Sequence, residues 1–186
     1  MPTANKVKFG LKKCYYATVT DDGLGNITFG TPAALPGAVS LNLTQQGDQQ
    51  KFYADDVAYY VTTPNDGYSG DLELALIPES FRKDILGETL DGTDKILVEK
   101  NTVELKPFAL LFEFDGDQKA TRHVLYNCAC GRPNVASSTK TNTTTPATET
   151  LSLTVSALPD GTVKASTTEN TPDATYNGWY TSVWTE

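Results

Sequence analysis

Short stretches in which apolar and polar residues alternate recur along the chain. In the first clear case Val39, Leu41 and Leu43 share one face of an extended chain, and polar residues lie on the other face. Turn sequences rich in Gly, Pro, Asn and Asp separate such stretches, as they separate strands. The pattern predicts about ten strands, over residues 12–20, 27–30, 38–45, 51–63, 71–77, 95–108, 108–114, 151–158 and 162–168, with a return strand after residue 118.

The stretch that begins at Pro107 is apolar on both faces. Two sets of side chains point in opposite directions from it: Phe108, Leu110, Phe112 and Phe114 on one side, and Ala109 and Leu111 on the other. A strand of this kind needs cover twice, as a central strand between two layers does. We therefore expect this strand to form an inner wall of the fold.

One short helix is predicted at about residues 78–86. Pro78 suits a first helical turn and Gly87 suits a C-terminal stop. An apolar stripe recurs at four-residue spacing: Ile77, Phe81 and Ile85. Two turns of helix are not stable alone, so this stripe should lie on the face of a sheet.

The fold class follows from these elements. Many short strands, one flanking helix and no alternation of strands with helices favour a mainly β protein, an antiparallel sandwich or barrel. We predict one β-sandwich domain over residues 1–168, with a long Ser/Thr-rich loop or arm at 137–150. Residues 169–186 are predicted as a C-terminal arm or tail.

The composition narrows the function. A formal net charge of −8 repels nucleic acid phosphate, so specific DNA binding is not expected. The chain has no apolar run of transmembrane length, and its basic start lacks the apolar core of a signal peptide. We therefore expect a protein that stays in the cytosol where it is made, with its three cysteines reduced.

Three groups of residues are candidates for a catalytic or metal-binding site, and each has an ordinary structural explanation. His123 is the only histidine, so it cannot complete a usual metal set, and it forms no recognisable triad. Cys128 and Cys130 face one side of a strand, but buried cysteines are most often small hydrophobes. A hydrolase that uses Asp115 or Asp117 with His123 remains an open hypothesis. No catalytic residue, cofactor or metal is predicted.

Aromatic residues gather near the C-terminal end of the chain. Tyr176, Trp179, Tyr180 and Trp184 lie in sequence that is otherwise rich in Asn, Gly and Thr. Tyr and Trp are enriched at protein–protein contacts. These residues motivate an alternative function, a carbohydrate- or protein-binding β-sandwich module such as a receptor adhesin.

Several long segments in fixed order resemble the major tail protein of long-tailed, non-contractile bacteriophages of Gram-positive hosts. They are KVKFGLKKCYYATVT, GNITFGTP and LPGAVSLNL, KFYADDVAYYV, NDGYSGDLELALIPESFRKDILGE, FALLFEFDGDQKATRHVLYNCACGRP and, after a variable Ser/Thr stretch, TETLSLTVSAL. The resemblance covers roughly residues 5–168. It implies a β-sandwich subunit of the tail tube, assembled as hexameric rings that stack around a lumen. The lumen holds the tape-measure protein and later conducts DNA.

The resemblance also implies partners and a location. The partners are other copies of the chain, the tape-measure protein, and the tail terminator and distal tail proteins, with DNA in transit and no membrane. The location that the resemblance implies is the virion tail, with assembly in the host cytoplasm. The stretch QQGDQQ, residues 45–50, reads as a polar loop tip that contributes little to a core. We predict subunit-interface residues there and at exposed aromatics: Gln45, Gln46, Asp48, Gln49, Gln50, Tyr53, Tyr59, Tyr60, Trp179 and Trp184.

Overall fold

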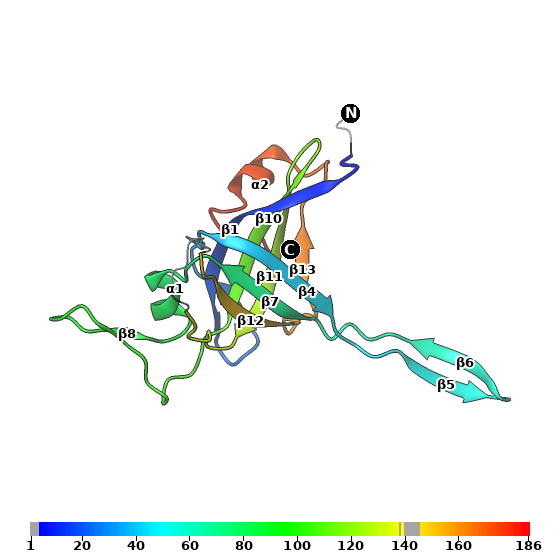
Figure 1. Cartoon of the computed structure of the whole chain (residues 1–186). Helices are drawn as coiled ribbons and strands as arrows, with labels where there is room; N and C mark the ends of the chain where they lie inside the picture. Colours follow the sequence, from blue (N-terminus) through cyan, green and yellow to red (C-terminus); the bar gives the residue numbers. More distant parts are fainter. Residues whose placement is uncertain (1–3, 138, 140–145) are drawn as a thin grey trace.

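The protein is built around one curled antiparallel sheet (Figure 1). The computed structural model describes residues 4–137, 139 and 146–186. Within them the main sheet has the strand order β2-β1-β10-β11-β12-β7-β4, with β3 beside β1 and β13 beside β11. The bounds are β1 Lys8–Asp21, β2 Ile27–Phe29, β3 Ala33–Ala34, β4 Ala38–Gln45, β7 Tyr68–Leu74, β10 Phe108–Gly116, β11 Thr121–Cys130, β12 Glu149–Ser156 and β13 Lys164–Ser166. The predicted mainly β, antiparallel fold is confirmed.

The sheet folds over on itself, so that two layers of strands face each other. In Figure 1, β4, β7 and β12 cross β1, β10 and β11. The Leu35 N–H donates to the Cys14 carbonyl at 2.8 Å, which extends the pairing of β3 with β1 to three residues before the start of β4. No ladder joins β1 to β4 in the described part of the chain, so the body is a sandwich and not a closed barrel.

Gly70 permits the close packing of strands in the β4–β7–β12 layer. It pairs with Leu43 of β4 on one side and with Leu153 of β12 on the other. A Cβ atom at this position would lie only 1.9 Å from the Asn42 carbonyl oxygen. Glycine is therefore required where these backbones approach each other.

Strand β10 is the inner wall that its sequence predicts. Phe108, Leu110 and Phe112 belong to a first core between the two layers. Ala109 and Leu111 point the other way into a second core. All five are buried, so the predicted burial on both faces is confirmed.

Helix α1, Glu79–Asp84, closes one end of the sandwich. Its Phe81 ring meets Tyr16 edge-on at 5.0 Å and Phe108 at 5.2 Å, both between ring centroids. The whole predicted stripe is buried: Ile77, Phe81 and Ile85. The helix is stable because it packs on the first core, since two turns would not hold alone.

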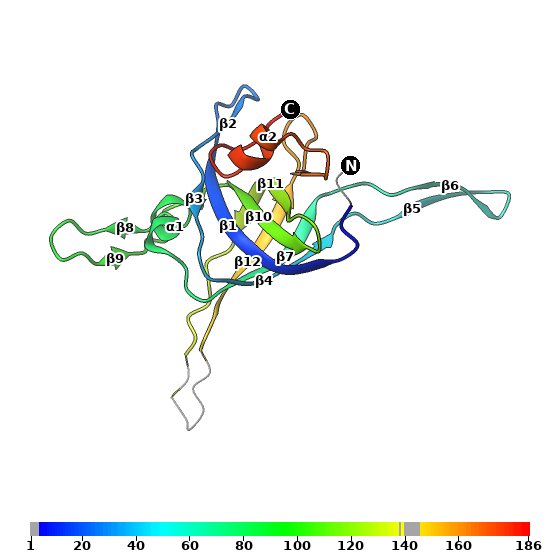
Figure 2. The same cartoon turned by 90° about the horizontal axis from the view of Figure 1, so that it is seen from above.

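A second helix, which the sequence analysis did not predict, covers the other face of the sheet. Helix α2, Asp173–Gly178, lies over β1, β10 and β11 in Figure 2. Trp179, directly after it, is only 3% exposed and belongs to the second core. The helix sequence DATYNG has no apolar stripe, so periodicity could not reveal it.

Two segments that were predicted as single strands take part in hairpins instead. Residues 51–63 reverse at Asp55 and Asp56, so that β5, Gln50–Ala54, pairs with β6, Val57–Thr62. Residues 95–107 contain only the short strand β9, Leu97–Val98, which pairs with β8, Thr89–Leu90. Both hairpins project from the body (Figure 2). The first prediction was wrong because a two-residue turn fits into a polar–apolar alternation without interrupting it.

The predicted loop at 137–150 lies partly outside the described residues. The division into residues 1–168 and 169–186 stays a prediction. In the part of the chain that the structure describes, neither helix has the length and apolar character needed to cross a bilayer.

Candidate assembly surfaces

A β-hairpin stands away from the body, and we call residues 46–67 the hairpin arm. The ladder between β4 and β7 ends with the pair Gln45 and Tyr68. Just beyond it the Gln46 N–H donates to the Gly67 carbonyl at 2.9 Å, which holds the two arm strands together at their root. Strands β5 and β6 then form a separate two-stranded sheet that points away from the sandwich (Figure 1).

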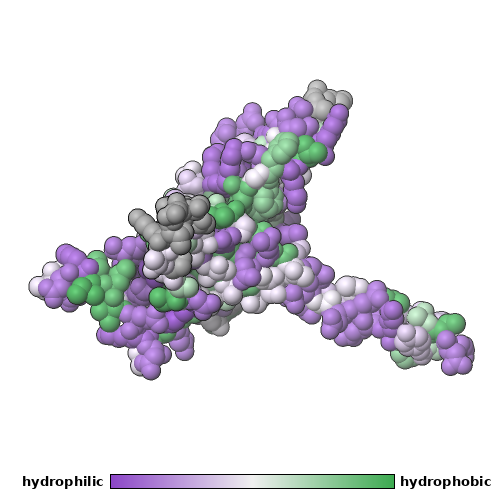
Figure 3. Space-filling model, in the orientation of Figure 1, coloured by the Kyte–Doolittle hydropathy of each residue, from purple (hydrophilic) through white to green (hydrophobic). Residues whose placement is uncertain are grey.

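The side chains of the arm are exposed although many are apolar. Tyr59 is 75% exposed. Five more large apolar side chains of the arm are also exposed: Phe52, Tyr53, Val57, Tyr60 and Val61. Figure 3 shows the hydrophobic colouring toward the end of the arm. An isolated hairpin is marginal in water, and large exposed apolar patches mark interaction sites.

The predicted interface residues of this region lie on the arm or at its base, but the tip of the arm is not where it was expected. Tyr53, Tyr59 and Tyr60 lie on its strands. The stretch 45–50 is the root of the arm, where Gln45 and Gln46 make hydrogen bonds, and Asp48 and Gln49 are exposed. The tip is the turn at Asp55 and Asp56, with φ of 51° and 59°. The expectation of a tip at 45–50 was therefore wrong.

The end of the sandwich away from α1 is open, and we call this opening the mouth. Strand β10 runs from Phe108, which touches α1, to Phe114 at the mouth. The mouth is a cavity of about 320 Å³. Its lining is mainly apolar and has two positively charged residues, Lys8 and Lys164. The other lining residues are Leu41, Leu43, Tyr68, Phe112, Phe114, His123, Val124 and Leu125. None of these described lining residues is acidic.

His123 lies in this mouth as an aromatic packing residue. Its ring stacks on Phe112 with 5.2 Å between centroids and 16° between planes, and Phe114 meets it edge-on. Burial, together with the smaller effect of the positive charges of Lys164 and Lys8, lowers the pKa of His123 to about 4. The imidazole is therefore neutral at physiological pH.

This lowered pKa predicts a defined acid sensitivity. The unfolded chain titrates near the ordinary value of 6.5 and the folded chain near 4. Between these values the unfolded state binds more protons, so the free energy of unfolding falls as pH drops. After allowance for partial exposure, we expect a loss of about 1–2 kcal/mol between pH 6.5 and pH 4. Below the folded pKa this contribution levels off.

Urea unfolding across this pH range checks the expectation with a single variant. His123→Phe removes the titrating group and keeps an aromatic ring on Phe112. The variant should lose about 1–2 kcal/mol less than the wild type between pH 6.5 and 4. Parallel profiles for the two proteins would show that His123 does not carry the effect.

A buried polar network holds the C-terminal residues 173–184, which we call the clasp, on the sheet. Glu113 is 3% exposed and accepts from Arg122 Nε and from Tyr180 Oη, each at 3.1 Å. Lys13 Nζ lies 3.1 Å from the other oxygen of Glu113. The Arg122 guanidinium also donates to the Tyr176 carbonyl and stacks 3.8 Å from the centre of that ring. The network thus joins β1, β10 and β11 to the clasp.

The C-terminal aromatic residues have most of their faces covered by the chain itself. Trp179 is buried and stacks on Trp184 at 6.5 Å between centroids. Tyr176 lies between Arg122 and Lys119, whose Nζ is 3.9 Å from the ring centre. Trp179 is thus not accessible as an interface residue in this conformation, whereas Trp184 is 39% exposed. These aromatics do not form the open platform that sugar stacking requires.

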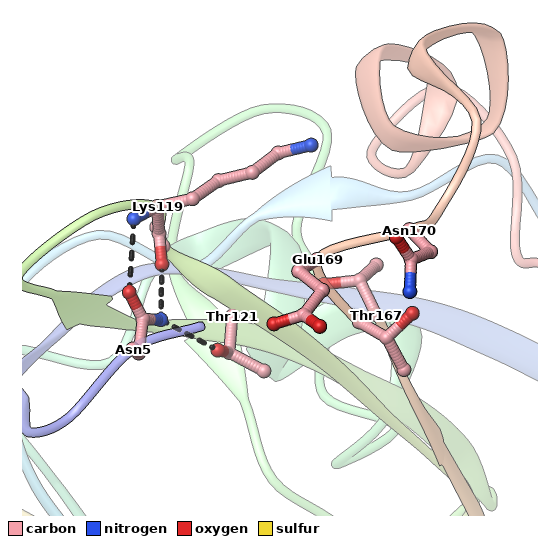
Figure 4. A pocket seen from close by; sticks show the side chains of 8 residues that line it. Asn5, Lys119, Thr121, Thr167, Glu169 and Asn170 are labelled. Atoms are coloured by element: carbon pink, nitrogen blue, oxygen red, sulfur yellow. Dashed lines mark hydrogen bonds between the residues drawn. The ribbon is translucent and has the colours of Figure 1, made fainter. Parts of the chain in front are cut away.

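A polar groove of about 440 Å³ lies beside the β10–β11 turn (Figure 4). In it the Asn5 amide donates to the Lys119 carbonyl at 2.5 Å, and its oxygen accepts the N–H groups of Gln118 and Lys119. Glu169 and Asn170 line the groove. Asn5 thus uses its amide to tie the N-terminal residues to this turn. The groove contains no set of groups arranged for catalysis.

The residues of the hydrolase hypothesis are not brought together. Asp115 pairs with Lys12, and Asp117 accepts the Lys6 N–H at 2.9 Å. That hydrogen bond holds the pKa of Asp117 below its usual value. Within the described residues no hydrogen bond or ion pair links His123 to either aspartate. Neither aspartate is therefore positioned as a partner for acid–base chemistry at His123.

The cysteines are free and buried in the first core. Burial raises the pKa of Cys14 to about 12 and that of Cys130 to about 11. Such thiols are unreactive at neutral pH. Among residues 4–137, 139 and 146–186, no three His, Cys, Asp or Glu side chains gather into a group that could hold a metal ion.

Comparison with protein families decides what kind of protein carries this exposed arm. The family model described as phage tail tube protein matches residues 3–182, nearly the whole chain. The chain belongs to the phage tail tube protein family. A comparison with curated proteins found no match. As a tail tube protein, the chain is a structural component of the virion tail.

Sequence reasoning missed two features of this tail tube protein. The mouth was not found because its lining comes from strands that are distant in sequence, and only the curl of the sheet joins Leu43 to Phe114 and Lys164. The Glu113 network was also missed. A signal for it exists, since Glu113 is a charged residue inside the apolar run of β10, and a buried charge needs a partner.

Proposed function

We propose that this tail tube protein assembles into hexameric rings that stack into a hollow tube, and that the hairpin arm ties the subunits together. The observation that supports this most directly is the arm itself. Its large aromatic and branched side chains are 44–75% exposed in the part of the chain that the structure describes. A neighbouring subunit that covers them stabilises both the arm and the assembly.

The acidic composition suits a conduit for DNA. Each subunit carries a formal charge of −8, so a ring of six is strongly acidic. DNA that passes through such a lumen meets repulsion and few places to bind. We therefore assign the lumen to the tape-measure protein during assembly and to DNA during ejection. The tail terminator and distal tail proteins are the proposed partners at the two ends, with assembly in the host cytoplasm.

The proposed role is structural and requires no enzymatic activity. Asp115, Asp117 and His123 are engaged in separate contacts, as described above. The contacts between subunits are head-to-tail and do not close along the axis, so they produce a filament. The hollow shape of this filament is then what allows it to hold the tape-measure protein and conduct DNA.

Sedimentation velocity over a range of protein and salt concentrations tests the proposal. We expect a transition from small species to very large ones as concentration rises, because head-to-tail assembly depends on mass action. A chain that remains a single small species under every condition would count against a tube subunit.

A further inference from the structure

We infer that the tip of the hairpin arm of one copy enters the mouth of a second copy, where Asp55 and Asp56 meet Lys8 and Lys164. This inference rests on the proposed function, since it names the surface that receives the arm. Tip and mouth are different surfaces of the same chain, so each copy offers one of each. Repetition of such a contact produces a ring or a filament.

The shapes of the two surfaces agree. The arm narrows to a two-residue turn, and apolar side chains near this turn lie on both faces of the hairpin. Tyr53 is paired with Ala58 and lies on one face, whereas Val57 and Tyr59, which alternate with Ala58, lie on the other. A hairpin that is apolar on both faces is covered better by a cavity than by a flat surface. The mouth offers such a cavity, with Leu43 and Phe114 in its lining.

The charges agree as well. The mouth carries the positive charges of Lys8 and Lys164, and none of its described lining residues is acidic. Lys8 Nζ lies 5.1 Å from the centre of the Phe114 ring and Lys164 Nζ lies 4.6 Å from the centre of the Tyr68 ring, so both positive charges lie at the mouth. The tip presents Asp55 and Asp56, and both are exposed. Complementary charges of this kind fix the partner and the register of a contact.

The second projection of the body fits the mouth less well. The hairpin of β8 and β9 also has an acidic turn, but the Asp91 carboxylate already accepts the N–H groups of Thr93 and Asp94, at 2.9 and 2.7 Å. Its exposed apolar residues are aliphatic, Ile96 and Val98. The arm of β5 and β6 also extends away from its own body in both views (Figures 1 and 2), so the mouth that it reaches belongs to another copy.

Charge removal at both surfaces tests the contact. Asp55→Asn with Asp56→Asn keeps the left-handed turn, which asparagine tolerates, and removes its charge. Lys8→Gln with Lys164→Gln removes the charge of the mouth. Each pair of changes should raise the concentration needed for assembly by roughly tenfold. The protein with all four changes should need no higher concentration for assembly than the more strongly affected of the two double variants, because both pairs of changes remove the same contact.

Asp91→Asn with Asp94→Asn on the other hairpin removes the same two negative charges as the change at the tip and is its matched control, which should leave assembly unchanged. Additive effects of the two pairs, or assembly that is unaffected by either pair, would overturn the inference. In both cases the proteins would still assemble, so the proposed function would stand.

Cross-linking tests the position of the tip directly. Val57→Cys in one preparation and Ser166→Cys in another place thiols beside the tip and beside the mouth, and the native cysteines are buried. When the two preparations are mixed and mildly oxidised during assembly, a disulfide-linked dimer should form. Neither variant alone should give it. Tubes without that dimer, or a dimer of equal yield between Asp94→Cys and Ser166→Cys chains, would overturn the inference. Absence of any assembly by the wild type would instead contradict the proposed function.

Discussion

Replacement of residues 47–65 by Asn-Gly should leave a folded, stable protein that no longer forms tubes. None of the arm residues belongs to either core. The strands β4 and β7 already meet at Gln45 and Tyr68, and Asn-Gly is the favoured two-residue turn for such a junction. We expect the free energy of unfolding to change by less than about 0.5 kcal/mol. Urea unfolding measures the stability, and electron microscopy measures the loss of tubes.

A matched replacement on the β8–β9 hairpin separates a general effect of shortening from a specific effect of the arm. Replacing residues 91–95 by Asn-Gly shortens only the turn of that hairpin, and it should reduce assembly less. If the arm replacement unfolds the protein, the arm is part of the body and not an assembly device. If tubes form as readily as before, the arm is not needed for assembly.

Glu113→Ala should destabilise the protein by about 3–5 kcal/mol, a large part of the total stability of a domain. The change leaves Arg122 buried with only part of its hydrogen bonding, and it removes the acceptor of the Tyr180 hydroxyl. The clasp should loosen from the sheet as a result. Both tryptophans of the chain, Trp179 and Trp184, lie in the clasp. Their fluorescence should therefore shift to longer wavelength before the body unfolds.

Two further variants show whether the effect comes from the buried network. Tyr180→Phe removes one hydrogen bond to Glu113 and should cost about 1 kcal/mol. Glu79→Ala breaks an exposed pair with Lys83 at 3.0 Å and should change stability by less than about 0.5 kcal/mol. A Glu113→Ala protein as stable as Glu79→Ala would mean that the network does not hold the clasp.

Local patterns predicted the strands and the first helix of the body well, because each of these segments has a single hydrophobic pattern along its length. Phe108 to Leu111 are apolar without a break, and the structure buries them on both faces. The stripe of α1 has helical spacing and an unbroken apolar character, so burial and local preference agree. Where one pattern and one environment coincide, the sequence is sufficient to predict the element.

The arm, the mouth and the clasp could not be predicted in the same way. Asp55 and Asp56 can serve as strand surface or as turn, and only the pairing of β5 with β6 selects the turn. The mouth depends on the curl of the whole sheet. Trp179 is buried because residues 173–184 return to the sheet, and this return depends on Glu113 and Arg122 far away in sequence. Contacts between distant segments leave little trace in local periodicity.

Electron microscopy of the purified, concentrated chain shows whether the hairpin arm builds a tube. We expect tubes of uniform width with a regular axial repeat from the full chain, and none when residues 47–65 are replaced. Particles that remain single copies in both preparations would contradict this expectation.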